Sequence, residues 1–331
     1  MTSFWTGKRV LVTGAGGFIA SHLIEELILN GASVRAFVRY NSRGDPGLLA
    51  QLPADIFNSI ELIAGDLRDG AAVQQAVKGI HTVFHLGALI AIPYSYIHPV
   101  EVVETNIMGT LNVLMAARSS GTERLVHTSS SEVYGTALRV PIDENHPLQG
   151  QSPYSASKIG ADKLAESFYC SYEVPVVTLR PFNTFGPRQS ARAVIPTIIT
   201  QALAETQIHL GSLETRRDFT YVSDTVAGFL KAAEAPGIEG QTFNLGVGKE
   251  VTVKDLAEII LEMIDHSVEI VIDQDRLRPE KSEVLRLLSD NQRARKILGW
   301  EPKVSLREGL RQTIEWIKSH QSFYQPTKYQ R

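Results

Sequence analysis

Short apolar runs rich in β-branched residues alternate with longer amphipathic segments through the first half of the chain. This alternation restricts the fold most strongly, because a strand–helix–strand order places strands parallel and covers both faces of their sheet with helices. Six runs have the length and composition of buried parallel strands, namely Arg9–Thr13, Val34–Arg39, Glu61–Ala64, Thr82–Leu86, Leu125–Ser129 and Val176–Leu179. Four segments have apolar residues at helical spacing, namely Phe18–Leu29, Ala71–Val77, Val100–Ala117 and Ala156–Tyr172. The chain is therefore predicted to be an α/β protein with a Rossmann-type, doubly wound parallel sheet.

The pattern changes after Arg180, where prolines and glycines interrupt it and several arginines stand in loop-like surroundings. We expect residues 1–180 to form the sheet domain and residues 181–331 to form a smaller, partly discontinuous C-terminal lobe. Within that lobe the segment from about 223 to 245 contains a predicted helix and a predicted strand, Ser223–Ala233 and Gln241–Leu245. These two elements are expected to return to the main sheet.

Composition limits what the chain can bind. With 331 residues, 43% of them hydrophobic, the chain has enough apolar material for one large core or two linked ones. Its 33 Lys and Arg residues against 36 Asp and Glu residues give a formal charge of −3, so no nucleic-acid partner is expected. No apolar run approaches the ~20 residues of a membrane span. The single cysteine, Cys170, cannot form an internal disulfide, which is typical of a protein from a reducing compartment, and its side chain is expected to be buried in the core. We therefore expect a cytoplasmic protein without membrane contact.

A glycine-rich turn follows the first predicted strand and precedes the first predicted helix. Gly14, Gly17 and Ala20 recur at three-residue spacing, a variant of the fingerprint in which glycines let backbone N–H groups approach a pyrophosphate. The pyrophosphate then lies at the positive end of the helix that begins at Phe18 and Ile19. A glycine-rich turn alone is ordinary loop chemistry, but the flanking strand and helix favour a dinucleotide site.

The end of the second strand favours NADP as the cofactor. NAD-binding sheets usually have an acid there that accepts from the ribose 2′-OH, whereas this sequence has Arg39, with Arg43 just beyond. A guanidinium pairs bidentately with a 2′-phosphate, and NAD is the alternative cofactor if both arginines are solvated loop charges. Asp66, after the third strand, is placed either to accept from an adenine amine or to cap the strand end.

Tyr154 and Lys158 lie four residues apart and therefore on one face of a predicted helix. A nearby ammonium is expected to stabilise the phenolate and to lower the Tyr154 pKa from about 10 toward neutrality, so that the phenolate can take a proton from an alcohol. This spacing alone is common on surface helices. It has more weight here because the helix follows the strand Leu125–Ser129, whose carboxyl end should lie at the ligand edge of the sheet.

These motifs occur in the order found in extended short-chain dehydrogenases/reductases that act on nucleotide sugars, and the resemblance covers nearly the whole chain. It rests on the glycine-rich turn, Asp66, His85-Leu86-Gly87-Ala88, Thr105-Asn106, Ser130 and the Tyr154/Lys158 pair. The segment Ser129–Gly135 resembles the hexose 4,6-dehydratase pattern, in which Glu132 follows the hydroxyl residue Ser130 by two places. Two further segments narrow the resemblance to the N-acetylglucosamine-nucleotide 4,6-dehydratases of the legionaminic-acid pathway, namely Ala91–Tyr96 and Pro147–Tyr154.

The resemblance implies a reaction without net redox change. Tyr154 takes the proton of the sugar 4-OH while C4 is oxidised, Ser130 hydrogen-bonds the same oxygen, and Lys158 holds the phenolate and the cofactor ribose. Glu132 then removes the C5 proton as water leaves C6, and the hydride returns to C6 from a tightly bound, regenerated cofactor. Ser131 stands where some 4,6-dehydratases have an Asp. Either Glu132 acts as both base and acid, or a water relayed by Ser131 supplies the proton.

The resemblance also assigns binding residues. The sheet domain would hold the dinucleotide through its glycine-rich turn and strand ends, with further contacts from Leu67, Leu86 and Ala88. The C-terminal lobe would hold a nucleotide-diphosphate sugar, because two phosphates need fork-shaped cations. The expected substrate contacts are Ser95, Asn106, Asn183, Arg188, Arg192, Arg217, Arg278 and Glu283, with Arg286 as an alternative partner for Glu283.

Alternatives stay open on the sequence. A UDP-glucuronate decarboxylase shares the Ser-Glu-Val-Tyr-Gly segment, a UDP-hexose 4-epimerase shares the C4 oxidation, and a cofactor-sensing regulatory protein would keep the fold without the chemistry. The nucleotide is UDP or GDP. Helices Val100–Ala117 and Ala156–Tyr172 resemble the pair through which relatives form a homodimer, with a tetramer as the larger alternative. His81 and His85 lack a third ligand, so we expect no metal and assign them to packing.

Overall fold

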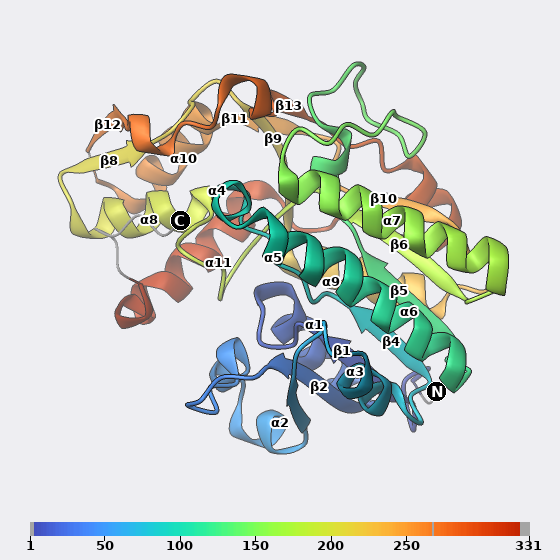
Figure 1. Ribbon diagram of the computed structural model, residues 1–331. Helices are drawn as coiled ribbons and strands as arrows, with labels where there is room; N and C mark the ends of the chain where they lie inside the picture. The colour runs from blue at the N-terminus through green and yellow to red at the C-terminus, as the bar shows by residue number, and fades with distance from the viewer. Residues whose placement is uncertain (1–2, 267, 325–331) are drawn as a thin grey trace.

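The computed structural model describes residues 3–266 and 268–324 (Figure 1). Its main sheet has seven parallel strands in the order β10-β6-β5-β4-β1-β2-β3, which confirms the predicted α/β fold with a doubly wound, Rossmann-type sheet. The strands are β1 (Arg9–Thr13), β2 (Ser33–Arg39), β3 (Glu61–Gly65), β4 (Thr82–His85), β5 (Arg124–Thr128), β6 (Val176–Pro181) and β10 (Thr242–Leu245). Each predicted strand forms, with ends shifted by at most two residues.

Helices cover both faces of this sheet (Figure 1). On one face α3, α6 and α7 pack against one another, and on the other α1 packs against α9. The helices of this part of the chain are α1 (Phe18–Leu29), α2 (Ala54–Asn58), α3 (Gly70–Val77), α4 (Ile92–Ile97), α5 (Pro99–Val103), α6 (Gly109–Ser120), α7 (Pro153–Tyr172) and α9 (Val222–Glu234), with single turns η1 (Gly47–Gln51), η2 (Glu104–Met108) and η3 (Ser131–Tyr134).

The predicted helix Val100–Ala117 is interrupted by the π-helical turn η2 between α5 and α6. The wider turn brings Asn106 inward, where its amide bonds both backbone groups of Leu89 at 2.8 and 2.9 Å. Thr110 donates to the Asn106 carbonyl at 2.6 Å and stabilises the same turn. A helix-period pattern contains no sign of such a turn, because the apolar spacing continues through it.

Two smaller sheets form after β6 in the second lobe. β9 lies at the centre of the larger one, with β11 antiparallel to it and with β7 and β13 parallel to it, while β8 pairs with β12 in the other. The elements of this lobe are β7 (Asn183–Phe185), α8 (Val194–Ala204), β8 (Gln207–Leu210), β9 (Arg216–Tyr221), β11 (Glu250–Thr252), α10 (Val253–Ile264), β12 (Glu269–Ile272), β13 (Arg286–Leu287) and α11 (Leu306–Ser319), with short turns η4 (Gln274–Arg276), η5 (Glu280–Ser282), η6 (Ala294–Leu298) and η7 (Gln321–Phe323). Between β9 and β11 the chain passes through α9 and β10, which belong to the layers of the main sheet.

The strand register brings three loops to one edge of the main sheet. Thr13 at the end of β1 pairs with His85 at the end of β4, and His85 pairs with His127 on β5. The glycine-rich turn, the segment after β4 and the segment after β5 therefore begin at the same level. This carboxyl edge is where parallel sheets of this class bind their ligands.

The helix α7 corrects one sequence expectation. Its sheet-facing side consists of Ala161, Ala165 and Phe168, all buried, whereas Cys170 is exposed. At about 100° per residue, two residues beyond Phe168 place Cys170 on the outer side of the helix, so the predicted burial of this thiol is wrong. No helix within residues 3–266 and 268–324 is long and apolar enough to cross a bilayer.

Candidate active site

The glycine-rich turn fits a dinucleotide backbone. Gly14 has a φ of +66°, and a Cβ added to it would lie 2.6 Å from the Gly87 Cα, so both the conformation and the close approach require glycine. Gly17 is the N-cap of α1 and precedes Phe18 and Ile19, the first residues of that helix. The turn therefore exposes backbone N–H groups at a helix N-terminus, where a pyrophosphate binds in this class of sheet.

At the end of β2, the Arg39 guanidinium pairs with a carboxylate that sequence analysis did not identify. Arg39 Nη2 lies 3.0 Å from Glu101 Oε1 of α5, and the Arg39 side chain remains 62% exposed. The Tyr94 hydroxyl donates to the same carboxylate, and this hydrogen bond is the largest single cause that lowers the Glu101 pKa, with Arg39 acting in the same direction. Arg43 lies beyond β2 in an exposed loop.

Asp66 has a partner of its own at the end of β3. Its carboxylate accepts from Arg68 Nη2 at 2.7 Å, and this side-chain hydrogen bond lowers the Asp66 pKa. The acid expected to meet an adenine amine is thus ion-paired with a neighbour two residues along. The adjacent Leu67 is buried, and Leu86 and Ala88 follow β4 directly.

The Tyr154–Lys158 pair lies at the start of α7, whose first turn is fixed by a capping box between Ser152 and Ser155. Both side chains of the pair are buried, with 6% of Tyr154 and 4% of Lys158 exposed. Lys158 Nζ donates to the carbonyl of Thr128, the last residue of β5, at 2.5 Å. The ammonium is therefore anchored to the carboxyl end of a central strand.

The expected lowering of the Tyr154 pKa is wrong for the protein alone. Burial raises the pKa of Tyr154 to about 12, and the charges of Glu132 and Asp162 add to this effect, while a hydrogen bond with Ser130 opposes it. Burial also lowers the Lys158 pKa to about 8. Desolvation thus outweighs the attraction that the spacing suggested, since Lys158 is directed to the Thr128 carbonyl.

The segment after β5 brings Ser130, Ser131 and Glu132 to the same edge. Ser130 is the N-cap of the turn η3, and its hydroxyl accepts from the Glu132 N–H at 3.2 Å. Ser131 is buried, whereas Glu132 keeps 13% of its side chain exposed. Glu132 Oε1 lies 3.8 Å from Arg278 Nη1, which comes from the far end of the chain.

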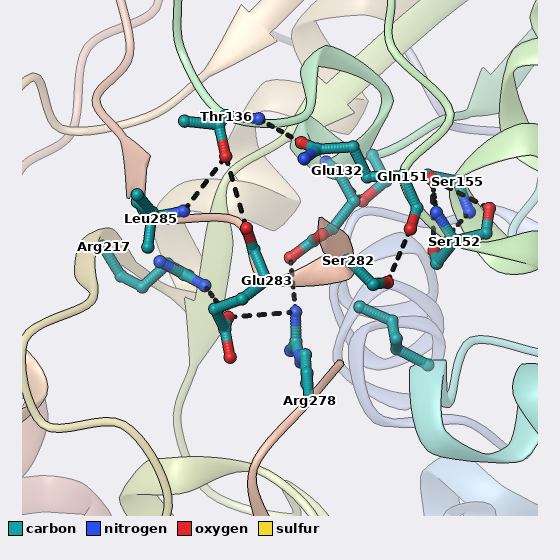
Figure 2. Close-up of polar contacts among 12 residues, drawn as sticks. Glu132, Thr136, Gln151, Ser152, Ser155, Arg217, Arg278, Ser282, Glu283 and Leu285 are labelled. Carbon is teal, nitrogen blue, oxygen red and sulfur yellow. Dashed lines mark hydrogen bonds and ion pairs between the residues drawn. The ribbon is translucent and has the colours of Figure 1, made fainter. Parts of the chain in front are cut away.

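Figure 2 shows how Glu132 joins a cluster of four charges with Arg217, Arg278 and Glu283. Glu283 Oε1 lies 3.5 Å from Arg217 Nη2 and 3.7 Å from Arg278 Nη1. The alternative partner of Glu283, Arg286, instead pairs with Glu250 at 2.8 Å. Arg278 Nη1 is buried and donates no hydrogen bond within the described residues, so it is available to an anion.

A cavity of about 290 Å³ opens beside this cluster. Five of the predicted substrate residues line it, namely Asn183, Arg192, Arg217, Arg278 and Glu283. A half-open cavity with several guanidinium groups and one carboxylate suits a ligand that carries phosphates and a hydroxylated sugar.

Three predicted substrate residues lie in other surroundings. Ser95 is fully buried and donates to the Ile92 carbonyl at 2.7 Å, and Arg188 pairs with Glu25 of α1 at 2.6 Å. The buried Asn106 uses its amide on Leu89 and on Ser157 Oγ, the latter at 2.9 Å. These three side chains hold the frame of the site and do not line the cavity. Asn106 and Arg188 were predicted from matched motifs. A motif does not distinguish a residue that contacts the substrate from a residue that holds the contacting residues in place.

His81 and His85 have polar partners rather than purely apolar packing. His85 lies between Thr13 Oγ1 at 2.8 Å and Thr110 Oγ1 at 3.0 Å, and His81 Nδ1 accepts from the Arg9 N–H at 2.9 Å. Within the part of the chain that the structure describes, no group of three potential metal ligands occurs.

Other residues of the site gave weak signals in the sequence. Gly87 belongs to the segment His85-Leu86-Gly87-Ala88 and has no distinctive spacing of its own, yet its N–H donates to Thr13 Oγ1 and its Cα lies close to Gly14. Asp162 and Arg180 form a buried ion pair at 3.0 Å next to Lys158. Their signal was a charged residue on an otherwise buried helix face and an arginine at the end of an apolar strand.

A sheet of this topology, with a buried Tyr–Lys pair at its carboxyl edge and a phosphate-suited lobe above it, is that of an extended short-chain dehydrogenase/reductase. The family can be stated more narrowly. Residues 11–313 match the family model described as GDP-mannose 4,6 dehydratase, and the chain belongs to this family of NAD-dependent nucleotide-sugar enzymes.

Individual relatives include both dehydratases and epimerases. The chain is 32% identical over 330 residues to the dTDP-D-glucose 4,6-dehydratase of Mus musculus, which covers 95% of this chain and 89% of that protein. It is also 32% identical over 317 residues to a UDP-glucose 4-epimerase of Mycolicibacterium smegmatis, with 94% and 99% covered. The structure of a dTDP-glucose 4,6-dehydratase from Streptomyces venezuelae with NAD bound superposes with a TM-score of 0.87 at 29% identity and covers 97% of this chain and 100% of that one.

Proposed function

We propose that the protein is a nucleotide-sugar 4,6-dehydratase that converts an NDP-N-acetylglucosamine, with UDP or GDP as the nucleotide, to the 4-keto-6-deoxy sugar. The position of Glu132 supports this proposal most directly. Its charge acts on the buried Tyr154 from one side, and its carboxylate faces Arg278 of the second lobe on the other. A dehydratase needs a base one carbon away from the oxidised centre, whereas a 4-epimerase needs none.

The roles of the side chains follow from this arrangement. When bound, the nicotinamide supplies the two-electron chemistry, taking a hydride from the sugar C4 and returning it to C6. Ionised Tyr154 accepts the 4-OH proton, and Ser130, which lowers the Tyr154 pKa, holds the same oxygen. Glu132 removes the C5 proton, and that proton leaves with the C6 hydroxyl as water, delivered by Glu132 itself or through a water beside Ser131. When the hydride returns to C6, C5 takes up one proton, which balances the 4-OH proton that Tyr154 accepted.

The substrate would enter through the cavity beside β9. Arg217 and Arg278 would hold the two phosphates, because each presents a guanidinium and Arg278 Nη1 donates no hydrogen bond to any residue that the structure describes. Glu283, which pairs with both arginines in the free protein, would then face the nucleotide ribose.

The two segments that narrow the resemblance to N-acetylglucosamine-nucleotide enzymes meet at one residue of the second lobe. Tyr96 Oη lies 2.7 Å from Ser282 Oγ, and Ser282 Oγ donates to the Gln151 carbonyl at 2.5 Å. Ser282 directly precedes Glu283. This contact brings both segments next to Glu283, which lines the cavity, and the N-acetylglucosamine assignment rests on the resemblance of the two segments.

The test is mass spectrometry of the purified protein with a panel of UDP- and GDP-hexoses, including their N-acetyl forms. We expect one N-acetylglucosamine nucleotide to lose one water, and deuterium placed on its C4 to appear in the C6 methyl group. Loss of CO₂ from a glucuronate nucleotide would identify a decarboxylase, and inversion at C4 without mass change an epimerase. Either outcome would refute the dehydratase assignment.

The variant Glu132→Gln tests the base within the same assay. It keeps the size of the side chain and removes its basicity, so C4 oxidation should persist while water loss falls by about 10²–10⁴-fold. The absorbance of the reduced nicotinamide reports the first step, and product mass reports the second. Unchanged dehydration in this variant would show that another group is the base.

A further inference from the structure

A buried carboxylate that the proposed reaction does not use lies directly behind the Tyr–Lys pair. Asp162 is one helical turn beyond Lys158 on α7, and it is 5% exposed. Its Oδ2 accepts from Ser129 Oγ at 2.8 Å and from Arg180 Nη2 at 3.0 Å, and its Oδ1 lies 3.1 Å from His127 Nε2. We refer to Asp162, His127, Ser129 and Arg180 as the Asp162 hub.

The hub connects every segment that carries a predicted catalytic side chain. Ser129 directly precedes Ser130, and the neighbouring Thr128 carbonyl receives the Lys158 ammonium. Arg180 Nη1 donates to the Tyr134 hydroxyl at 3.0 Å, and Tyr134 ends the turn that contains Ser131 and Glu132. One carboxylate thus ties α7 to the end of β5, to β6 and to η3.

The charges around the hub favour an ammonium at Lys158. Burial lowers the Lys158 pKa to about 8, and the negative charge of Asp162 raises it. His127, and His85 behind it on β4, face the same space, but burial lowers the pKa of both imidazoles, so they are neutral at neutral pH. Arg180 on β6 pairs with Asp162, and the other charged side chains that line the cavity of about 690 Å³ beside Asp162 are Lys163 and Glu166 on α7, Glu144 and Arg293.

We propose that Asp162 is a positioning residue for the reaction: it keeps Lys158 in its charged form and holds the Ser129–Glu132 segment against α7. This inference rests on the proposed use of Tyr154 and Lys158. A buried Asp–Arg pair is by itself weak evidence, because such pairs also serve only as part of the core. The distinction lies in the pH dependence, since a purely structural pair has no reason to move a catalytic ionisation.

The deciding variant is Asp162→Asn, which keeps the shape and removes the charge. Without the carboxylate, Lys158 loses its proton at lower pH, so the basic limb of the kcat profile should move down by about one pH unit. Activity relative to wild type should therefore fall about sixfold more at pH 8.5 than at pH 6.5, while KM for the sugar nucleotide stays within about threefold, because Arg217 and Arg278 are untouched.

Two further variants keep the proposal falsifiable. Asp162→Glu retains the charge and should restore the position of the basic limb even where kcat is lowered. Asp224→Asn changes another buried carboxylate, on α9, which accepts from the Val304 N–H at 2.9 Å, and should leave the limb unchanged. The proposal is overturned if folded Asp162→Asn shows the wild-type profile at a uniformly lower rate, or if Asp224→Asn shifts the limb equally.

A second measurement covers the case in which Asp162→Asn does not fold. Ser129→Ala removes one hydrogen-bond donor to the Asp162 carboxylate without changing any charge. It should lower kcat by a similar factor at every pH, because the Ser129–Glu132 segment loses its hydrogen bond to Asp162 of α7. Wild-type kcat in Ser129→Ala would then overturn the positioning role. If the wild-type protein proves to be an epimerase or a decarboxylase, the same pair still ionises during C4 oxidation, and the profiles still decide the role of Asp162.

Discussion

The choice between NADP and NAD depends on Arg39, which forms an ion pair with Glu101. We propose that it binds the 2′-phosphate of NADP, with NAD as the alternative cofactor, although its guanidinium lies 3.0 Å from Glu101 in the free protein. Arg39→Ala should then weaken NADP by about tenfold or more, the value of a charge-assisted hydrogen bond, and hardly affect NAD.

The matched variant for this prediction is Glu101→Gln, which removes the competing carboxylate and should strengthen NADP binding. Fluorescence titration of both cofactors measures the two effects. Equal losses for NAD and NADP in Arg39→Ala would contradict the NADP assignment.

Gly14 allows a second prediction at this scale. Gly14→Ala would place its Cβ 2.6 Å from the backbone of Gly87 and keep a φ of +66° that alanine disfavours. We expect loss of cofactor binding together with a lower Tm. Gly44 has a similar φ of +63° but open space around it, so Gly44→Ala should cost only about 1–2 kcal/mol and leave cofactor affinity unchanged. Retained cofactor binding in Gly14→Ala would show that the turn is not the pyrophosphate site.

Side-chain types at fixed spacing selected residues that the fold brings close together, and their roles in the reaction remain predictions. Tyr154, Lys158, Ser130 and Glu132 lie at one sheet edge, and Arg217, Arg278 and Glu283 meet at the cavity. The sequence could not show the partners that each charge takes in three dimensions. Asp66 is held by Arg68, and the Tyr154 pKa rises, because desolvation depends on burial that a motif does not contain.

At the scale of elements, α5, η2, α6 and α7 carry exposed apolar side chains. They are Val100, Val103, Met108 and Met115, with Tyr169 and Tyr172 on α7, each at least 39% exposed. We propose that these side chains pair with a second copy of the chain, because exposed apolar groups mark interfaces and two-fold dimers are the commonest oligomers.

The variant Met108→Asp should convert the dimer to a monomer in light scattering coupled to size exclusion, since it would bury a charge in the interface. Leu29, 67% exposed at the end of α1, provides the matched control, and Leu29→Asp should leave the mass unchanged. A monomeric wild-type protein would refute the proposed homodimer.

The elements themselves were largely predictable because their causes are local. β1 and α1 begin and end where the apolar pattern predicts, since buried parallel strands and amphipathic helices have distinct periods. The short strands of the second lobe could not be predicted in this way. β7, β11 and β13 contain two or three residues each and exist only through pairing with β9. Pairing between distant segments has no local signature.

At the scale of the whole molecule, buried histidines make stability depend on pH. His22 on α1 lies 3.0 Å from the Pro187 carbonyl and so joins the main sheet to the second lobe, and burial lowers its pKa from 6.5 to about 4. In the unfolded chain the His22 imidazole binds a proton below about pH 6.5, whereas in the folded chain it binds that proton only below about pH 4. His22 therefore reduces the free energy of unfolding progressively across that window, by about 2 kcal/mol at pH 5.

The comparison with His22→Gln isolates this effect. Asp218, whose pKa burial raises to about 6, acts with the opposite sign and is common to both proteins. Urea unfolding at pH 7.5 and pH 5 should show a smaller loss of stability in His22→Gln than in the wild type, whereas the exposed His98→Gln should behave like the wild type. An identical loss in both variants would contradict the assignment to His22.

The position of β10 at the edge of the main sheet has a consequence for biosynthesis. β6 pairs with β10, whose residues follow β7, α8, β8 and β9 in the chain. While the ribosome is still making those segments, the nascent sheet ends in an unpaired strand that can recruit a neighbouring nascent chain. Translation must reach Leu245 before that edge closes, so slow codons upstream of this point should lower the yield of native protein.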